Sequence, residues 1–365
     1  MNHTMGILRL LLALGVVTEH AGNGYFVGSY TAVQIFFLIS GFYMALIWSS
    51  GRYETMPRFY ASRCARLFPA YWIAVIVGTG FAFLVDNFTG TNSAISQLFR
   101  YLSGADFPMS VWVIFSNGFL VSSDFAWFID SVDIEGLGKL HPIHLLIQPP
   151  VWTLALEIYF YALCPFLVRA KTWVLVLMIA IVILARILGY YYGLNSNPYH
   201  SRFFPFEISI FLLGILAYRL FISQGSLALC LRGPVGCGVA VGYLCVVMYF
   251  YDIVKFIPLP SVYGFQDYIH SLLLYLLSVP AIVGLFSWTA RLQFDRMIGE
   301  FSYPIYISHY AFVSTLLHTK LGLPFNMAPF WPILILTVTA AVLIHVAIQR
   351  PVDKIRIGAF AATRS

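Results

Sequence analysis

TWVLVLMIAIVILARILGYYYG, residues 172–193, holds a single charged side chain, Arg186, in an otherwise apolar run. A helix needs about 20 apolar residues to cross the hydrocarbon core of a bilayer. Similar runs recur along the 365 residues, of which 60% are hydrophobic and only 10% are charged. Soluble globular proteins carry about 25% charged residues. The composition therefore predicts a polytopic membrane protein and excludes a soluble enzyme, a nucleic-acid binder and a disordered chain.

Ten apolar runs are long enough to be spans, and they should be helical because a backbone in lipid must satisfy its own hydrogen bonds. The predicted ranges are 4–21, 31–50, 67–86, 151–168, 172–193, 204–221, 235–251, 268–288, 298–318 and 330–349. A cytoplasmic N-terminus places most of the 21 Lys and Arg residues on the cytoplasmic side, as the positive-inside rule requires. We therefore expect an all-α fold with both termini inside and the first apolar run retained as a spanning helix.

The stretch between the third and fourth expected spans, residues 87–150, must cross the bilayer twice or not at all to keep this orientation. It contains one apolar run, residues 111–128, which Asn117 and Asp124 interrupt. This pattern predicts a re-entrant or interfacial segment on the outer face. Residues 1–365 are expected to form one transmembrane domain without an appended soluble domain.

Ionisable side chains inside a span cost several kcal/mol each, so each is a candidate functional residue. Arg9 and His20 are 11 residues apart in the first span. That spacing is within about 20° of three helical turns and rises about 16 Å, so both should project from one face. Histidine is suited to exchange a proton near neutral pH. The alternative is two helix-end residues, one bound to lipid headgroups and one hydrated.

An arginine cluster, Arg58, Arg63 and Arg66, lies in RFYASRCARLFPAYW at residues 58–72, before the third expected span. If this stretch is helical, Arg63 and Arg66 share a face. Two guanidinium groups on one face can bind phosphate oxygens bidentately. The cluster therefore predicts a cytoplasmic site for a phosphate-bearing donor, with ordinary positive-inside charge as the alternative.

Two later spans also carry polar groups. Glu157 lies about six residues into its span, and Tyr161 follows one turn later. Such a carboxylate can orient an imidazole, accept a hydroxyl proton or hold a structural arginine. His309 follows Tyr306 by one turn and is either a packing residue or part of the site. Arg186 and Glu207 could pair with each other.

Metal binding has no support in the sequence, because the cysteines form neither a CxxC motif nor a Cys/His cluster. They are Cys64, Cys164, Cys230, Cys237 and Cys245. We expect neither a metal site nor a disulfide framework.

Five motifs occur in a characteristic order along nearly the whole chain; one departure is Gln349-Arg350-Pro351, where an acidic residue is expected ahead of the proline, and another is the lack of an appended soluble domain. They are RLLLALGVVTEH (9–20), VQIFFLISGFYMAL (33–46), RFYASRCARLFPAYW (58–72), VWTLALEIYFYALCP (151–165) and FSYPIYISHY (301–310). Together they resemble the acyltransferase 3 family of integral membrane O-acyltransferases.

The resemblance implies transfer of an acyl group, most often acetyl from cytoplasmic acetyl-CoA, to a hydroxyl of an extracytoplasmic glycan or lipid-linked saccharide. It implies a multi-pass protein of the cell inner membrane that needs no metal. The implied donor-binding residues are Arg9, Arg58, Arg63 and Arg66. His20 is the implied catalytic base, which either deprotonates the acceptor hydroxyl or carries the acyl group itself, with Glu157 orienting or charging the imidazole. The implied substrate-binding residues are Trp152, Tyr306 and His309.

Other functions also fit the sequence. Intramembrane Arg, Glu and His residues mark substrate paths in transporters of glycans or lipids as well as catalytic sites. An acyltransferase acting on a small secreted molecule is a further alternative. The identity of the acyl group, the acceptor and the oligomeric state are left open by the sequence.

Overall fold

The computed structural model describes residues 4–24, 26–51, 53, 55–91, 93–104, 107–134, 138–250, 253, 265–318 and 330–360. Residue 251, the predicted end of the seventh span, lies outside these ranges. In the described residues nearly all regular structure is helical, and the one sheet is an antiparallel pair of short strands in which Asp133 faces Lys139.

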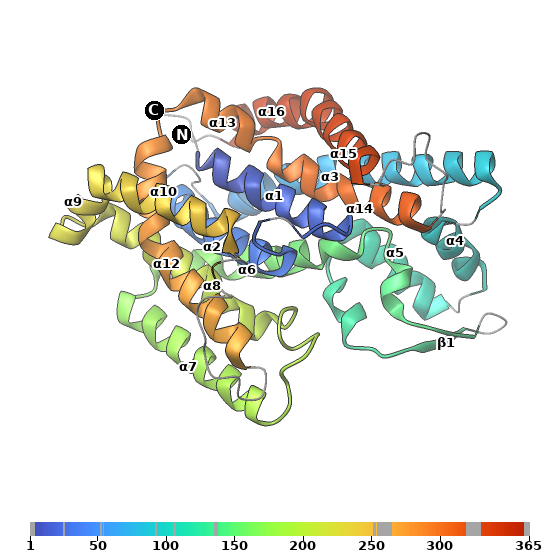
Figure 1. Cartoon of the computed structure of the whole chain (residues 1–365), viewed down its shortest axis with the longest axis horizontal. Helices are drawn as coiled ribbons and strands as arrows, with labels where there is room; N and C mark the ends of the chain where they lie inside the picture. Colours follow the sequence, from blue (N-terminus) through green and yellow to red (C-terminus); the bar gives the residue numbers. More distant parts are fainter. Residues whose placement is uncertain are drawn as a thin grey trace.

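The elements follow one another along the chain as Figure 1 shows. The longer helices are α1 (Gly6–His20), α2 (Ser29–Ser49), α3 (Met56–Thr89), α4 (Ala94–Gly104), α5 (Phe107–Phe119), α6 (Trp152–Arg169), α7 (Thr172–Tyr191), α8 (Phe204–Ile222), α10 (Pro234–Met248), α12 (Phe265–Thr289), α14 (Ser302–His318), α15 (Phe330–Ile344) and α16 (Arg350–Phe360). The short elements are η1 (Asp124–Trp127), β1 (Val132–Ile134), β2 (Gly138–Leu140), η2 (Pro142–Leu145), η3 (Pro149–Val151), α9 (Ser226–Arg232), α13 (Gln293–Gly299) and the π-helical turn η5 (His345–Gln349).

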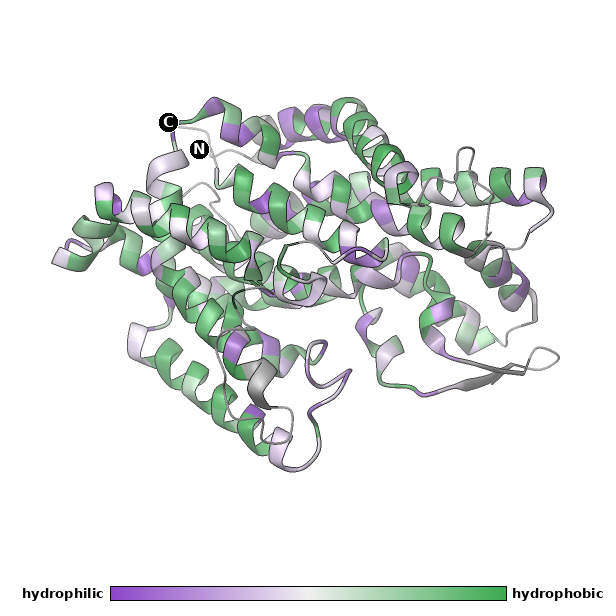
Figure 2. Cartoon of the chain, in the orientation of Figure 1, coloured by the Kyte–Doolittle hydropathy of each residue, from purple (hydrophilic) through white to green (hydrophobic). Residues whose placement is uncertain are grey.

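Every predicted span coincides with a helix, but the expected count of ten spans is not reproduced. Among the described residues, seven helices are long and apolar enough to cross a membrane, and α9 with α10 makes an eighth if this pair, bent by 67°, counts as one span. The helices α1 and α14, with 15 and 17 residues, are shorter than a typical span. Apolar residues dominate α7, α12 and α15, whereas polar residues gather in α13 and α16 (Figure 2).

The core of the fold is the crossing of α2 and α8, where two glycines allow backbone contact. A Cβ atom at Gly41 would lie 2.1 Å from the Phe211 carbonyl oxygen, and one at Gly214 would lie 2.0 Å from the Leu38 carbonyl oxygen. Small residues let helices approach closely where lipid offers no hydrophobic driving force. This contact fixes the direction in which Ser40, the neighbour of Gly41, projects.

A second group of helices packs around α1, which contacts α2, α13 and α14, while α14 also contacts α3 and α15 (Figure 1). The N-terminus of α1 is capped from α13: both oxygens of the buried Asp295 carboxylate accept backbone N–H bonds, from Gly6 at 2.7 Å and Ile7 at 2.9 Å. A carboxylate at a helix N-terminus satisfies unpaired N–H groups and interacts favourably with the helix dipole. The cap fixes the position of the Arg9 turn relative to α14.

The expected outer segment forms a separate group of elements, α4, α5, η1 and the β1–β2 hairpin (Figure 1). With 13 residues, α5 is not among the candidate spans. The buried Asp124 anchors η1 to α6 by accepting a 2.8 Å hydrogen bond from the Tyr159 hydroxyl, and burial raises the pKa of its carboxyl group. Phe128 then packs edge-on against Phe203, in the segment between α7 and α8.

The predicted pairing of two intramembrane charges is confirmed. Arg186 on α7 donates to Glu207 on α8 at 2.6 Å, and both side chains are buried. Gln34 on α2 donates to the other Glu207 oxygen at 2.8 Å. This network joins three helices, so these two charges serve a structural role in the fold.

Candidate active site

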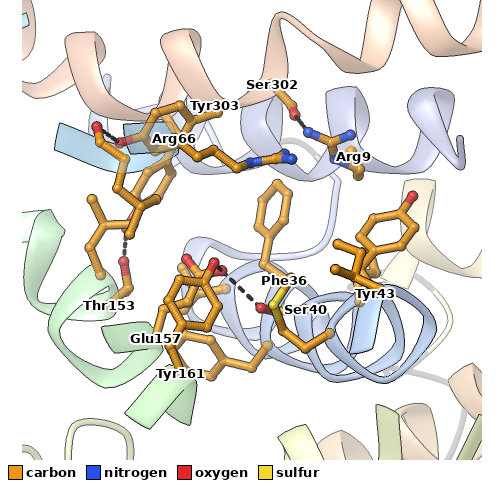
Figure 3. A pocket seen from close by; sticks show the side chains of 18 residues that line it. Arg9, Phe36, Ser40, Tyr43, Arg66, Thr153, Glu157, Tyr161, Ser302 and Tyr303 are labelled. Carbon is orange, nitrogen blue, oxygen red and sulfur yellow. Dashed lines mark hydrogen bonds between the residues drawn. The ribbon is translucent and has the colours of Figure 1, made fainter. Parts of the chain in front are cut away.

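A cavity of about 110 Å³ lies between α1, α2, α3, α6 and α14. Its volume is several times what a single water molecule requires. It is lined by Arg9, Val33, Phe36, Phe37, Ile39, Ser40, Tyr43, Met44, Ile47, Arg66, Leu67, Thr153, Leu154, Glu157, Tyr161, Ser302, Tyr303 and Tyr306. Two cations, one carboxylate and the hydroxyl groups of Ser40, Thr153 and Ser302 therefore border a space whose other walls are apolar and aromatic (Figure 3).

One wall of the cavity carries the two guanidinium groups. Arg9 donates a 2.9 Å hydrogen bond from Nη2 to Ser302 Oγ, at the start of α14. Arg66, from α3, extends along the same wall toward Arg9 (Figure 3). Within the described part of the chain, Arg66 makes no hydrogen bond. Two cations on one wall, one of them without a hydrogen bond in the described chain, form an attractive site for an anionic or strongly polarised ligand.

The opposite wall carries the carboxylate. Glu157 Oε1 accepts a 2.8 Å hydrogen bond from Ser40 Oγ and a second one from the Tyr161 hydroxyl. Glu157 and Tyr161 both act electrostatically on Arg66 across the cavity. The two hydroxyl groups are therefore held toward the cavity by one carboxylate, and Ser40 takes a polar role while Gly41 provides the close helix contact.

Arg63 and Arg66 differ sharply in their surroundings. Arg63 is 2% exposed, does not line the cavity, and donates from Nη2 to the Tyr53 hydroxyl at 2.9 Å. Its guanidinium also lies over the rings of Tyr53 and Phe59, each at 5.8 Å. Arg58 lies exposed in the first turn of α3. Of the three clustered arginines, only Arg66 reaches the cavity.

The His20 imidazole lies at the other end of α1, outside the cavity lining. Its ring centroid is 5.2 Å from that of the buried His309 and 5.7 Å from that of Tyr310. His20 Nδ1 is 2.8 Å from the Val16 carbonyl oxygen, and His309 Nδ1 is 2.6 Å from the Tyr306 carbonyl oxygen. A carbonyl only accepts, so in both neutral rings Nδ1 carries the hydrogen and Nε2 holds a free lone pair.

The contacts between α1 and α14 show how these two helices run relative to each other. Near the start of both helices, Arg9 on α1 bonds Ser302 on α14. Farther along both helices, His20 on α1 contacts His309 on α14. The two helices therefore run in the same direction, and Arg9 and His20 share the face of α1 that meets α14. The expectation that Glu157 orients the imidazole is not met in this structure, because Glu157 bonds Ser40 and Tyr161 whereas His20 bonds Val16.

Tyr306 connects the cavity to the histidines. Its hydroxyl donates to the Pro150 carbonyl at 2.7 Å and lies 2.7 Å from Thr153 Oγ1, while its ring is 5.8 Å from that of His309. Trp152 is buried and does not line the cavity. Its ring lies instead beneath the Arg202 guanidinium, 4.9 Å away.

Four of the nine residues singled out from the sequence line the cavity: Arg9, Arg66, Glu157 and Tyr306. The other five lie elsewhere, in three places: Arg58 and Arg63 near the start of α3, His20 and His309 together, and Trp152 against Arg202. Sequence reasoning missed the lining residues Tyr43, Ser302 and Tyr303. Tyr303 lies inside the FSYPIYISHY motif, which was the available signal.

The polar groups of the cavity suit an anionic or carbonyl-bearing ligand. Among the described residues, no group of three or more His, Cys, Asp or Glu side chains could hold a metal ion. The unpaired Arg66 guanidinium suits phosphate oxygens or a polarised carbonyl. The apolar lining suits a small acyl group.

A comparison with protein families identifies the chain. The family model of the acyltransferase 3 type, described as an acyltransferase domain, matches residues 2–349, nearly the whole length. Comparisons with curated proteins and with solved structures gave no match. With helices suited to a bilayer and this match, the chain is a multi-pass membrane protein that belongs to the acyltransferase 3 family of membrane acyltransferases.

Proposed function

We propose that the protein transfers an acetyl group from cytoplasmic acetyl-CoA to a hydroxyl of an extracytoplasmic glycan or lipid-linked saccharide, in the cell inner membrane. The observation that carries this proposal is the arrangement along α1. Arg66, which makes no hydrogen bond within the described residues, lines a cavity beside Arg9, and His20, whose Nδ1 bonds a carbonyl, lies at the opposite end of the helix that carries Arg9.

At the cavity, Arg9 and Arg66 bind the donor. Their guanidinium groups attract the negative charge of the donor's phosphate groups, and the pantetheine arm extends from there to bring the thioester to His20. Arg58, exposed at the start of α3, assists at the cytoplasmic mouth, and Arg63 acts indirectly by fixing the first turns of α3 against Tyr53.

At the other end of α1, His20 acts as general base. Its Nε2 takes the proton of the acceptor hydroxyl as the hydroxyl oxygen forms a bond to the thioester carbonyl carbon. The carbon–sulfur bond then breaks, and the CoA thiolate leaves and is protonated. His309 and Tyr306 line the passage between the two ends, a distance of about 16 Å along α1 from Arg9 to His20.

Glu157 supports the transfer from the opposite wall of the cavity. By accepting hydrogen bonds from both Ser40 and Tyr161, it fixes two hydroxyl groups and partly balances the two guanidinium charges. Residues 1–365 are proposed to act as one transmembrane domain in this reaction.

The proposal is tested with purified protein in nanodiscs supplied with acetyl-CoA and a hydroxyl acceptor. We expect release of free CoA thiol by the wild type and its loss in His20→Ala. His144→Ala, which changes an exposed histidine of η2, serves as the matched control and should keep wild-type activity. A wild type that neither binds nor consumes acetyl-CoA would contradict the proposal and favour a transporter without covalent chemistry.

A further inference from the structure

Arg202 lies in the segment between α7 and α8, against two tryptophans from other parts of the chain. Its guanidinium carbon is 3.7 Å from the ring centroid of Trp127, in η1, and 4.9 Å from that of Trp152, at the start of α6. A guanidinium over an indole face is held by cation–π attraction, and this contact leaves its in-plane N–H groups free to bond other partners. Three distant segments of sequence therefore converge on one cation.

The guanidinium of Arg202 has no acidic partner among the described residues. Its Nη1 donates to Ser201 Oγ at 3.1 Å, its Nε is buried without a partner, and its Nη2 makes no hydrogen bond within the described chain. Glu207 acts on Arg202, but the Glu207 oxygens already bond Arg186 and Gln34. Burial lowers the pKa of Arg202 to about 10, so the side chain is still a cation at neutral pH.

A partly buried cation without a counter-ion is costly, and a bound anion would remove the cost. A carboxylate or a phosphate matches the flat edge of a guanidinium, with two parallel N–H···O bonds. The indole rings of Trp127 and Trp152 fix the plane of that edge. Arg202 and the two indole rings therefore form the elements of an anion-binding group for which no described residue supplies the anion.

A series of contacts leads from Arg202 to His20: Trp152, under its guanidinium, precedes Thr153, which bonds Tyr306, whose ring is 5.8 Å from that of His309 and so next to His20. Arg202 and Glu19 also act electrostatically on His20. The Glu19 carboxylate is engaged, since its two oxygens accept from the backbone N–H and the hydroxyl of Ser29, at the N-terminus of α2. Of the two charged groups that act on His20 in the described part of the chain, Arg202 is thus the one available to a ligand.

We propose that Arg202 binds a carboxylate or phosphate group of the acceptor and so brings the neighbouring hydroxyl to His20. The inference rests on the proposed function and narrows it, because it makes the acceptor an acidic saccharide. Trp127 and Trp152 are then positioning residues that act through Arg202, and Trp152 does not itself contact the acceptor.

The test measures binding of three small sugars to the full chain in nanodiscs: methyl glucuronide, glucose 1-phosphate and neutral methyl glucoside. For the wild type we expect one or both anionic sugars to bind about 10- to 100-fold more tightly than methyl glucoside, the range of a charged hydrogen bond. Whichever of methyl glucuronide and glucose 1-phosphate binds more tightly shows whether the site prefers a carboxylate or a phosphate. Arg202→Gln should abolish the preference, and Arg202→Lys, which keeps the charge without the flat edge, should restore part of it.

Arg296→Gln, at an exposed arginine that bonds Glu300, is the matched control and should keep the preference. Thermal unfolding of each variant shows whether it is folded. Equal affinity for anionic and neutral sugars in the wild type, including no binding of either, overturns the inference, as does a preference that survives in folded Arg202→Gln.

Acetyl-CoA binding, measured on the same samples, separates this inference from the proposed function. Acetyl-CoA bound by both wild type and Arg202→Gln, with the sugar preference lost only in the variant, supports the acidic-acceptor site. If the sugar preference depends on Arg202 but the protein does not bind acetyl-CoA, the acidic-sugar site is supported and the proposed acetyl transfer is overturned.

Discussion

The Arg9 end and the His20 end of α1 differ in how their polar groups are satisfied. At the Arg9 end, Arg66 projects into a cavity of about 110 Å³ without a hydrogen-bond partner in the described chain. At the His20 end, each histidine ring bonds a carbonyl oxygen of its own helix and the two rings pack together. A guanidinium without a hydrogen bond at a cavity is suited to bind a ligand. A histidine ring with a fixed tautomer is suited to move a proton.

The largest effect is expected from His20→Ala. Loss of a general base lowers the rate of acyl transfer by about 100- to 10,000-fold. The donor cavity is lined by other residues, so the affinity for acetyl-CoA should stay within about twofold of wild type. Steady-state thiol release and equilibrium binding check the two expectations separately, and normal turnover by the variant would remove His20 from the mechanism.

The second-largest effect is expected from replacing Arg66, and replacing Arg63 on the same helix should have a different result. Arg66→Gln removes a guanidinium that lines the cavity, and we expect acetyl-CoA to bind about 10- to 100-fold more weakly with thermal stability unchanged. Arg63→Gln removes buried bonds to Tyr53 and should lower the free energy of unfolding by about 1–3 kcal/mol. Binding isotherms and thermal melts of both variants provide the check. If Arg63→Gln weakened acetyl-CoA binding more than Arg66→Gln in a fully stable protein, Arg63 rather than Arg66 would be the donor-binding arginine.

A smaller effect is expected from Glu157→Gln. The amide oxygen can still accept from Ser40 and Tyr161, so the fold should persist, but the negative charge opposite the arginines is lost. We expect kcat to fall about 5- to 20-fold with little change in the affinity for acetyl-CoA, consistent with 1–2 kcal/mol for a charged hydrogen-bonding group. Tyr161→Phe, which removes one of the two donors, is the control and should have the smaller effect. A wild-type kcat in Glu157→Gln would reduce Glu157 to a structural residue.

The smallest effects concern the carboxylates that cap helices at the two ends of α1. Asp295 is buried and caps α1 with both oxygens, whereas Glu19 is exposed and caps α2. We expect Asp295→Ala to lower the free energy of unfolding by about 1–2 kcal/mol and Glu19→Ala by less than about 1 kcal/mol. Reversible unfolding in detergent compares the two, and an equal loss for both would mean that burial of the cap adds nothing.

The positions of the helices could be predicted from hydropathy because an apolar run of the right length has few other structures in a bilayer. The predicted span 67–86 lies within a longer helix, because α3 begins at Met56 and so includes the arginine-rich turns, which hydropathy does not register as apolar. The pairing of Arg186 with Glu207 was also foreseen, because two buried opposite charges on successive helices have strong reason to meet.

The contacts within the site could not be predicted in the same way. Arg63 and Arg66 are three residues apart and so differ by about 60° around the helix axis. Because of that rotation, Arg63 lies against Tyr53 whereas Arg66 lines the cavity. Which arginine reaches the cavity depends on the elements that α3 packs against. The approach of His20 to His309 and of Ser40 to Glu157 joins helices far apart in sequence, and only the packing of α1, α2, α6 and α14 specifies it. The same holds for Arg202 and its two tryptophans.

The most direct test of the division between the two ends is equilibrium binding of acetyl-CoA to His20→Ala and Arg66→Gln, side by side in nanodiscs without acceptor. We expect wild-type affinity for His20→Ala and affinity reduced about 10- to 100-fold for Arg66→Gln. Weakened binding by His20→Ala together with unaltered binding by Arg66→Gln would contradict this expectation, since the donor would then be held at the histidine end of α1.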